Sequence, residues 1–226
     1  MNRRIIAPTL AAMSLLASCS PVELRSDIKE FVASFSLSES MSTYVSGGYT
    51  SVKETRFDGV IRHINESLTF DMKNPENPVY EYQKSIQIGE ETPEITKNFL
   101  KKIDDKIYFV EGEKEPVEYN AQQINKLFTD FFYKETMYDG AYHAQGMYYG
   151  DLLLETAREL QDFITINDAK TELFFEHNSK GRVDGKDAEI KQKYSVNKLG
   201  MLIKNNVEQH NGDDYIIQEI NVFKSE

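Results

Sequence analysis

Hydrophobic and polar positions follow two different periods along the chain, one typical of helices and one typical of strands. Residues 22–35 place apolar side chains at helical spacing, which predicts an amphipathic helix. From residue 36 to residue 119 apolar and polar positions alternate, as in VYEYQKSIQI at 79–88. Alternation of this kind is typical of antiparallel strands with one face in water. We therefore expect one helix followed by several antiparallel strands.

Turn signals divide this alternating region into separate strands. SGG at 46–48 and NPENP at 74–78 combine glycine, proline and asparagine, the residues that favour turns. The stretch KIYFVEGEKEPVEY at 106–119 predicts a hairpin that reverses around residues 111–115.

Helical spacing returns between residues 121 and 164 as an insertion within the strand pattern. Phe128, Phe131 and Phe132 share one face of the first predicted helix. Leu153 and Leu160 lie on the apolar stripe of a second helix. The segment between the helices, YDGAYHAQGMYYG, is rich in glycine and tyrosine and predicts a loop.

The remainder of the chain returns to the strand pattern. TELFFEH at 171–177 predicts a strand, NSKGRVDGKD at 178–187 predicts a polar turn, and two or three further strands follow. Asn211-Gly212 is typical of a two-residue hairpin turn, which requires positive φ at both residues.

The start of the chain has the layout of a secretory signal peptide. Arg3 and Arg4 form a basic region, residues 5–17 are mainly apolar or small, and Cys19 is the one cysteine in the chain. An apolar run of this length is too short to span a bilayer, which takes about 20 residues.

Leu16-Ala17-Ser18-Cys19 resembles a bacterial lipobox. The resemblance implies a diacylglycerol on the Cys19 thiol, cleavage before Cys19, acylation of the new amino terminus, and anchoring on the extracytoplasmic side of a membrane in the bacterial cell envelope. Residues 1–18 would then be a signal peptide, and residues 19–226 a single domain attached to the membrane. An ordinary cleaved signal and an incidental cysteine in a cytosolic protein are the alternatives.

The charge of the chain limits its partners. Residues 1–18 contain two arginines and no acid, so the chain from Cys19 onward has 24 basic and 37 acidic side chains and a formal charge of −13. Such a surface repels phosphate backbones, and we expect no nucleic-acid partner. It also disfavours adsorption to anionic lipid by charge, so the lipid anchor must hold the protein at the membrane.

The order of elements, together with FVASF at 31–35, resembles the LolA, LolB and LppX group of proteins. The resemblance implies an α+β fold in which a curved antiparallel sheet, a half-barrel, wraps around a few helices. In that group a hydrophobic cavity between sheet and helices takes acyl chains. The helical insertion near 121–164 would fill the concave side of the sheet.

Catalytic and metal-binding motifs are missing from the sequence. It contains no H-x-x-x-H or H-E-x-x-H pair, no G-x-S-x-G elbow and no glycine-rich phosphate loop. Adjacent acids at 90–91, 104–105 and 213–214 are expected in solvated turns, although a carboxylate pair distant along the chain stays open as an alternative. We expect no enzymatic activity, no metal and no cofactor. Three of the histidines are expected to be solvated: His63, His177 and His210. The fourth, His143, lies in the predicted loop.

These patterns lead to two alternative functions. The first is a membrane-anchored lipoprotein that binds or carries a lipid, an acyl chain or another small hydrophobic molecule, with Phe128, Phe131, Phe132, Leu153 and Leu160 as candidate ligand contacts. The second is a structural or protein-interaction lipoprotein in which the same side chains fill an ordinary core. An apolar void between helices and sheet would distinguish the first function from the second.

Overall fold

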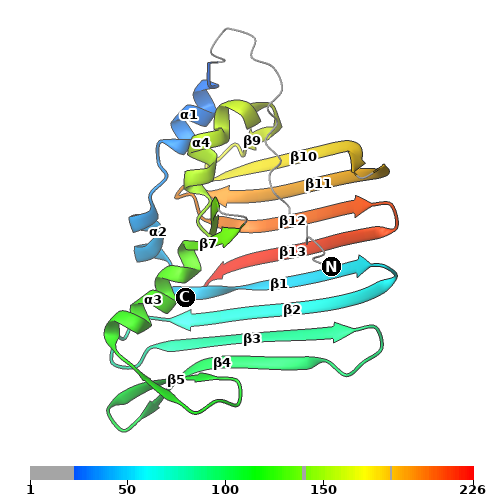
Figure 1. Ribbon diagram of the computed structural model, residues 1–226. Helices are drawn as coiled ribbons and strands as arrows, with labels where there is room; N and C mark the ends of the chain where they lie inside the picture. The colour runs from blue at the N-terminus through cyan, green and yellow to red at the C-terminus, as the bar shows by residue number, and fades with distance from the viewer. Residues whose placement is uncertain (1–22, 139–140, 184) are drawn as a thin grey trace.

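The structure, a computed structural model, describes residues 23–138, 141–183 and 185–226. Two antiparallel series of strands make up most of it (Figure 1). The first series comprises β1 (Ser46–Phe57), β2 (Val60–Asp71), β3 (Val79–Ile88), β4 (Glu94–Ile103), β5 (Lys106–Glu111) and β6 (Val117–Tyr119). The second comprises β9 (Ile164–Ile166), β10 (Glu172–Val183), β11 (Lys186–Asn197), β12 (Leu202–Asn211) and β13 (Asp214–Lys224).

The two series form one open sheet because their first and last members pair. The strand order is β6-β5-β4-β3-β2-β1-β13-β12-β11-β10-β9, so β1 and β13 lie at the centre. Their antiparallel register runs from Gly47 opposite Lys224 to Arg56 opposite Tyr215. Both edge strands, β6 and β9, have only three residues. Short edges of this kind offer few unpaired backbone groups to another chain.

The helices lie against one face of this sheet, toward the end where β1 begins (Figure 1). They are α1 (Ser26–Val32), α2 (Leu37–Thr43), α3 (Ala121–Phe132), α4 (Gly150–Leu160) and a short 3-10 helix, η1 (Gln161–Phe163). A separate hairpin of β7 (Lys134–Tyr138) and β8 (Ala141–Gln145) connects α3 to α4. The predicted α+β class and the antiparallel sheet are therefore confirmed.

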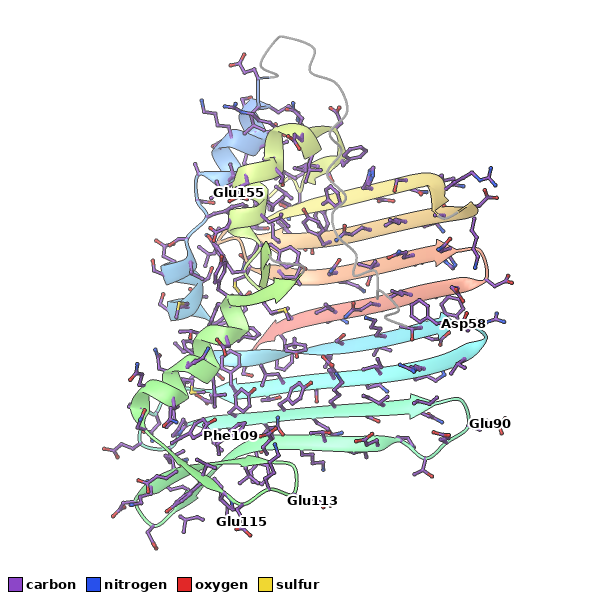
Figure 2. All side chains as sticks on the ribbon, viewed as in Figure 1. Asp58, Glu90, Phe109, Glu113, Glu115 and Glu155 are labelled. Atoms are coloured by element: carbon purple, nitrogen blue, oxygen red, sulfur yellow. The ribbon has the colours of Figure 1, made fainter. Side chains whose placement is uncertain are left out.

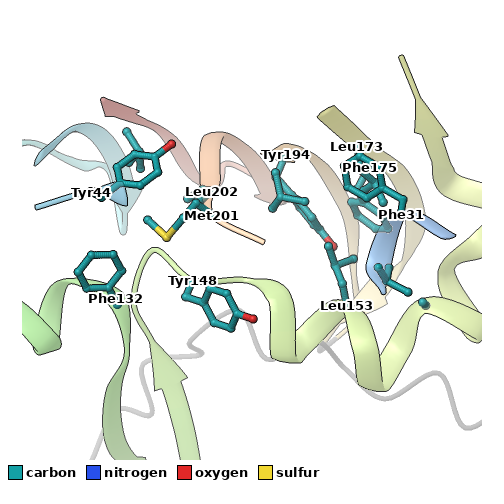
Figure 3. Close-up of a cluster of buried hydrophobic side chains, with 14 of the residues drawn as sticks. Phe31, Tyr44, Phe132, Tyr148, Leu153, Leu173, Phe175, Tyr194, Met201 and Leu202 are labelled. Atoms are coloured by element: carbon teal, nitrogen blue, oxygen red, sulfur yellow. The ribbon is translucent and has the colours of Figure 1, made fainter. Parts of the chain in front are cut away.

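One hydrophobic core joins the helices to the sheet (Figure 3). Phe131 of α3 packs on Phe70 of β2 with ring centroids 4.7 Å apart. Leu153 of α4 and Ile28 of α1 are completely buried in the same cluster. The buried side chains of this cluster come from both the helices and the sheet.

Local capping explains where α3 begins. The Asn120 side chain accepts a hydrogen bond from the Gln123 backbone, and the Gln123 side chain accepts one from the Asn120 backbone. This reciprocal capping box satisfies two backbone N–H groups that a helix start leaves unpaired. The predicted aromatic face of the helix then turns toward the sheet.

The predicted first helix is correct in its buried face and wrong in its length. Ile28, Phe31 and Val32 are buried as expected, but α1 ends at Val32 and a second helix, α2, follows where strands were expected. The Ser36 hydroxyl accepts a hydrogen bond from the Glu39 backbone and starts this second helix. The alternating pattern was therefore extended about ten residues too far toward the start.

The SGG sequence at 46–48 is not a turn, because it lies inside β1. A Cβ atom added to Gly48 would collide with the Leu68 carbonyl of β2, and one added to Gly47 with the Phe223 carbonyl of β13. The glycines allow these central strands to approach closely, which is the other common reason for glycine in a strand.

Two further loop predictions were too long. The glycine- and tyrosine-rich segment after α3 contains the β7–β8 hairpin. The stretch 178–187 is mostly strand, since β10 and β11 stay paired as far as Val183 and Lys186. Polar residues here belong to long exposed strands, so polarity alone was a poor signal for a turn. The predicted turn at 74–78 and the hairpin around 111–115 are confirmed.

The predicted turn at Asn211-Gly212 is displaced by one residue. Asn211 still pairs with Asp214, so Gly212 and Asp213 are the central residues of the turn. Gly212 alone has positive φ, at 62°, whereas positive φ at both predicted residues was expected. The hairpin between β1 and β2, by contrast, has two such residues, Asp58 and Gly59, as a type I′ turn requires.

Candidate functional site

The helix-bearing side of the sheet, called the inner face here, has a covered half and an open half. Sheet residues of the core cluster all belong to the half beneath the helices, for example Leu68, Phe70 and Val222. The strands continue well beyond the helices toward the β1–β2 turn, where Asp58 is labelled (Figure 2). On each strand, the side chains two, four and six residues beyond the last core residue, in the direction of the β1–β2 turn, point to the same face as that core residue. These side chains form the open half.

The five predicted ligand contacts lie in the covered half. Phe131 is 4% exposed, Phe132 1% and Leu153 0%, and each is enclosed by other protein side chains. Phe128 and Leu160 are partly buried and pack against the same core. Phe128 lies next to Phe70 and Phe132 at centroid distances of 5.5 and 5.0 Å. The helical spacing therefore predicted correctly that Phe128, Phe131 and Phe132 share one face of α3.

Three polar side chains mark the border between the covered and open halves. Tyr194 and Asn205 are directly opposite each other on β11 and β12, and they are only 5% and 7% exposed. The Tyr194 hydroxyl has no hydrogen-bond partner among the described residues, and neither does the Asn205 side-chain oxygen. The other Asn205 amide atom donates to the Tyr149 hydroxyl at 3.3 Å. Buried polar groups without partners are rare in folded proteins and costly.

Burial also fixes the protonation state of these tyrosines. Desolvation raises the pKa of Tyr149 to about 12 and raises the pKa of Tyr194 further above its usual value. Both phenols therefore stay neutral at physiological pH and keep their hydroxyl hydrogens. A polar group of a ligand at this border would find a hydroxyl donor and an amide acceptor without a partner.

The open half combines aliphatic side chains with uncharged polar ones and a few charged ones, such as the Glu66–Lys84 pair. Its half-buried aliphatic members are Ile64, Ile86, Ile190, Val207 and Ile216. Neutral polar side chains lie between them at Gln192, Gln209 and Gln218. The Gln209 side-chain oxygen is buried without a partner in the described structure. Such a mixture of apolar surface and hydrogen-bonding groups is typical of sites for amphiphilic molecules.

The opposite, outer face of the sheet has a different character. Four outer-face lysines each lie close to a glutamate on the same or a neighbouring strand: Lys180, Lys191, Lys193 and Lys204. The shortest of these pairs, Lys193 with Glu176, measures 2.7 Å. Exposed ion pairs of this kind contribute little stability but keep a surface soluble. The outer face is therefore the solvated face.

The histidines do not converge on a common site. His63 lies 3.2 Å from Glu54 on the outer face, and the ring of His210 lies near Tyr215. His177 on the inner face meets the Phe163 ring edge to face at a centroid distance of 4.3 Å, and its Nδ1 atom is buried without a described partner, so it is less solvated than predicted. His143 lies in β8, where side chains are outside the described set. Within the described residues no three potential ligands are arranged to hold a metal ion.

The adjacent acids lie in or beside turns, as the sequence predicted. Residues 104–105 connect β4 to β5, residues 90–91 follow β3, and Asp213 lies in the turn before β13. Asp104 takes a positive φ of 54°, a conformation that aspartate tolerates in tight turns. The position of these acids favours solvation rather than catalysis.

An open pocket of about 480 Å³ lies between α1 and the loop after β9. Charged side chains dominate its wall, and Glu30 pairs with Lys170 across it at 2.9 Å. An acyl chain would gain little there, because the apolar area of the wall is small. This pocket is therefore a weaker candidate than the inner face.

Cys19 and the predicted signal peptide lie outside the described residues. Within residues 23–226, apart from the three positions left out, no helix is both long enough and apolar enough to cross a membrane. The chain matches no known family model, and it matches no curated protein.

Proposed function

We propose that this protein is a lipoprotein of the bacterial cell envelope, anchored through Cys19, that binds a lipid or another hydrophobic molecule on the inner face of its sheet. The sheet would curve around the helices as a half-barrel, and the ligand would lie along the open half. Anchoring would hold this face near the membrane, because α1 begins only seven residues after Cys19.

One observation carries this proposal. The helices cover only part of the inner face, and the remaining part is not packed like the core. Aliphatic and neutral polar side chains lie there beside a few charged ones, such as the Glu66–Lys84 pair. This part presents half-buried isoleucines beside glutamines, and its border contains the Tyr194 hydroxyl, which has no hydrogen-bond partner in the described part of the chain. A ligand with an apolar chain would shield the aliphatic side chains from water, at roughly 25 cal/mol per Å² of area removed. It would also give the border hydroxyl a partner.

The covered half defines how far such a ligand reaches without a change of structure. Phe128 and Leu160 are partly exposed and remain proposed contacts at the edge of the helices. Contact with Phe131, Phe132 or Leu153 would require the helices to move away from the sheet, because these side chains are enclosed. Movement of that kind would expose part of the core and would cost stability.

Binding is tested with the soluble domain, residues 20–226, which contains the whole described core. We expect native mass spectrometry to show a co-purifying lipid, and a polarity-sensitive dye or a fatty acid to bind at micromolar concentration. Two adjacent residues of β13 provide matched variants, because Ile216 faces the open half and Ile217 is 41% exposed on the outer face. Ile216→Glu should weaken binding, since it places a charge beneath the ligand. Ile217→Glu should leave binding unchanged.

Equal effects of the two substitutions would contradict a ligand on the inner face. Absence of binding to any apolar probe would reject the carrier function and favour the structural or protein-interaction alternative.

Lipidation is tested separately in cells. We expect Cys19→Ala to leave a precursor of full length and to abolish labelling by a fatty-acid probe, because Cys19 is the one thiol in the sequence. Labelling that survives this substitution would disprove the anchor.

A further inference from the structure

Two cationic side chains of the open half have no carboxylate partner among the residues that the structure describes. Lys53 of β1 lies opposite Ile64 of β2, and Arg62 of β2 lies opposite Thr55 of β1. Both therefore belong to the inner face and are diagonal neighbours across β1 and β2, where side chains are about 7 Å apart. Neither cation forms an ion pair with any residue that the structure describes.

Carboxylates on the same face of neighbouring strands are engaged with other groups. Glu66, the inner-face acid of β2, pairs with Lys84 at 2.8 Å. Asp214, the inner-face acid of β13, accepts a hydrogen bond from the Asp58 backbone at 3.0 Å. In a chain with an excess of eleven negative charges, two neighbouring cations without a described carboxylate partner form a local site of positive charge. They would attract an anion that the remaining surface repels.

Apolar side chains surround this pair of cations. Ile88 lies opposite Arg62 on β3, and Ile64 is paired with Ile86. Toward the β1–β2 turn, Phe57 and Val60 lie opposite each other and are 47% and 46% exposed. Large apolar side chains with this degree of exposure, grouped on one face, often mark a binding surface.

We propose that Lys53 and Arg62 bind the anionic head group of an amphiphilic ligand, a carboxylate or a phosphate, whose alkyl chain lies along the isoleucines of the open half. This inference rests on the proposed function and specifies its ligand class. Arginine offers two parallel N–H donors to a carboxylate or a phosphate, and lysine adds a mobile point charge. The head group would lie in the middle of β1 and β2, and the chain would extend across β2 and β3 over Ile64 and Ile86.

The test compares three probes on the soluble domain, each below the concentration at which it forms micelles. Dodecyl phosphate has the chain and the anionic head, dodecyl maltoside has the same chain with a neutral head, and inorganic phosphate has the anion alone. Isothermal titration calorimetry measures each dissociation constant at low and at high salt. We expect dodecyl phosphate to bind about ten-fold more tightly than dodecyl maltoside at low salt, with a smaller difference at high salt because salt screens exposed charges.

Two double variants, each of which removes two positive charges, test which residues bind the head group. Lys53→Gln with Arg62→Gln should reduce dodecyl phosphate affinity about ten-fold, to the level of the neutral probe, and should leave the neutral probe unaffected. The control is Arg56→Gln with Lys97→Gln, which removes two cations from the outer face of β1 and β4. It should leave all three affinities nearly unchanged, since neither residue faces the ligand.

Each other outcome overturns a distinct part of the proposal. Equal binding of the two dodecyl probes would reject the head-group site and leave the proposed lipid-binding function intact. An anionic preference that persists in the Lys53→Gln and Arg62→Gln variant would show that other residues bind the head. Inorganic phosphate binding as tightly as dodecyl phosphate would indicate a site for free anions. Failure of both dodecyl probes to bind would reject the proposed function itself.

Discussion

Phe131→Leu distinguishes a filled core from a ligand-lined space beneath α3. Phe131 is 4% exposed, and its ring lies 4.7 Å from the ring of Phe70 and 4.9 Å from that of Phe132. Leucine is about as hydrophobic as phenylalanine, so the transfer free energy changes little. The substitution instead removes two aromatic contacts, each worth about 0.5–1.5 kcal/mol beyond area burial, and leaves a small void. We therefore expect a loss of roughly 1–3 kcal/mol in the free energy of unfolding.

Equilibrium unfolding in urea, followed by far-ultraviolet circular dichroism, measures this loss. For a chain of this size a change of 1 kcal/mol also corresponds to a shift of about 2–4 °C in Tm. Phe57→Leu is the control, because Phe57 is 47% exposed at the β1–β2 turn and lies outside the core. An unchanged midpoint for Phe131→Leu would refute the reasoning, and it would show that the space around Phe131 is not tightly packed.

Three further predictions concern the backbone and the tyrosines. Gly48→Ala should destabilise the sheet by more than about 1 kcal/mol, because its Cβ would collide with the Leu68 carbonyl, whereas Gly181→Ala meets open space and should be nearly neutral in the same urea titration. Gly212→Val should cost roughly 1 kcal/mol or more, measured by thermal unfolding, because a β-branched residue is strained at a φ of 62°. Burial raises the pKa of Tyr149 from 10.0 to about 12, so its contribution to stability is complete below pH 10 and is lost as the pH rises toward 12. Tyr149→Phe should reduce this alkaline loss in unfolding curves recorded between pH 9 and pH 11, and an identical loss in the variant would contradict the assignment.

Periodicity predicted the sheet and the main helices because both depend on which face of an element is apolar. The alternation in VYEYQKSIQI placed Tyr80 and Tyr82 on the inner face, where both contact the core. The helical spacing of Phe131 and Phe132 predicted their shared burial for the same reason. Which face of a helix or strand is buried can therefore be predicted from the sequence, because the pattern lies within that one element.

Features that depend on tertiary structure were not visible in the sequence. Gly47 and Gly48 have the composition of a turn, and only the close approach of three strands explains them as strand residues. Tyr194 and Asn205 are far apart from Tyr149 along the chain, so no spacing rule indicated that the three would meet. The alternation of Ile190, Gln192 and Tyr194 was the one available signal that β11 presents neutral polar groups to the inner face.

The sheet cannot form as a whole until β1 pairs with β13. Most other neighbours in the sheet are also neighbours along the chain and can pair locally, but this central seam joins Gly47 to Lys224. Until the eleven residues of β13 are available, two partial sheets remain, each with one long unpaired edge: β1 on one and β12 on the other. Edges of that length are templates for pairing with a second molecule. A chain shortened before Asp214 would therefore lose the connection between its halves, and it should aggregate rather than merely fray at its end.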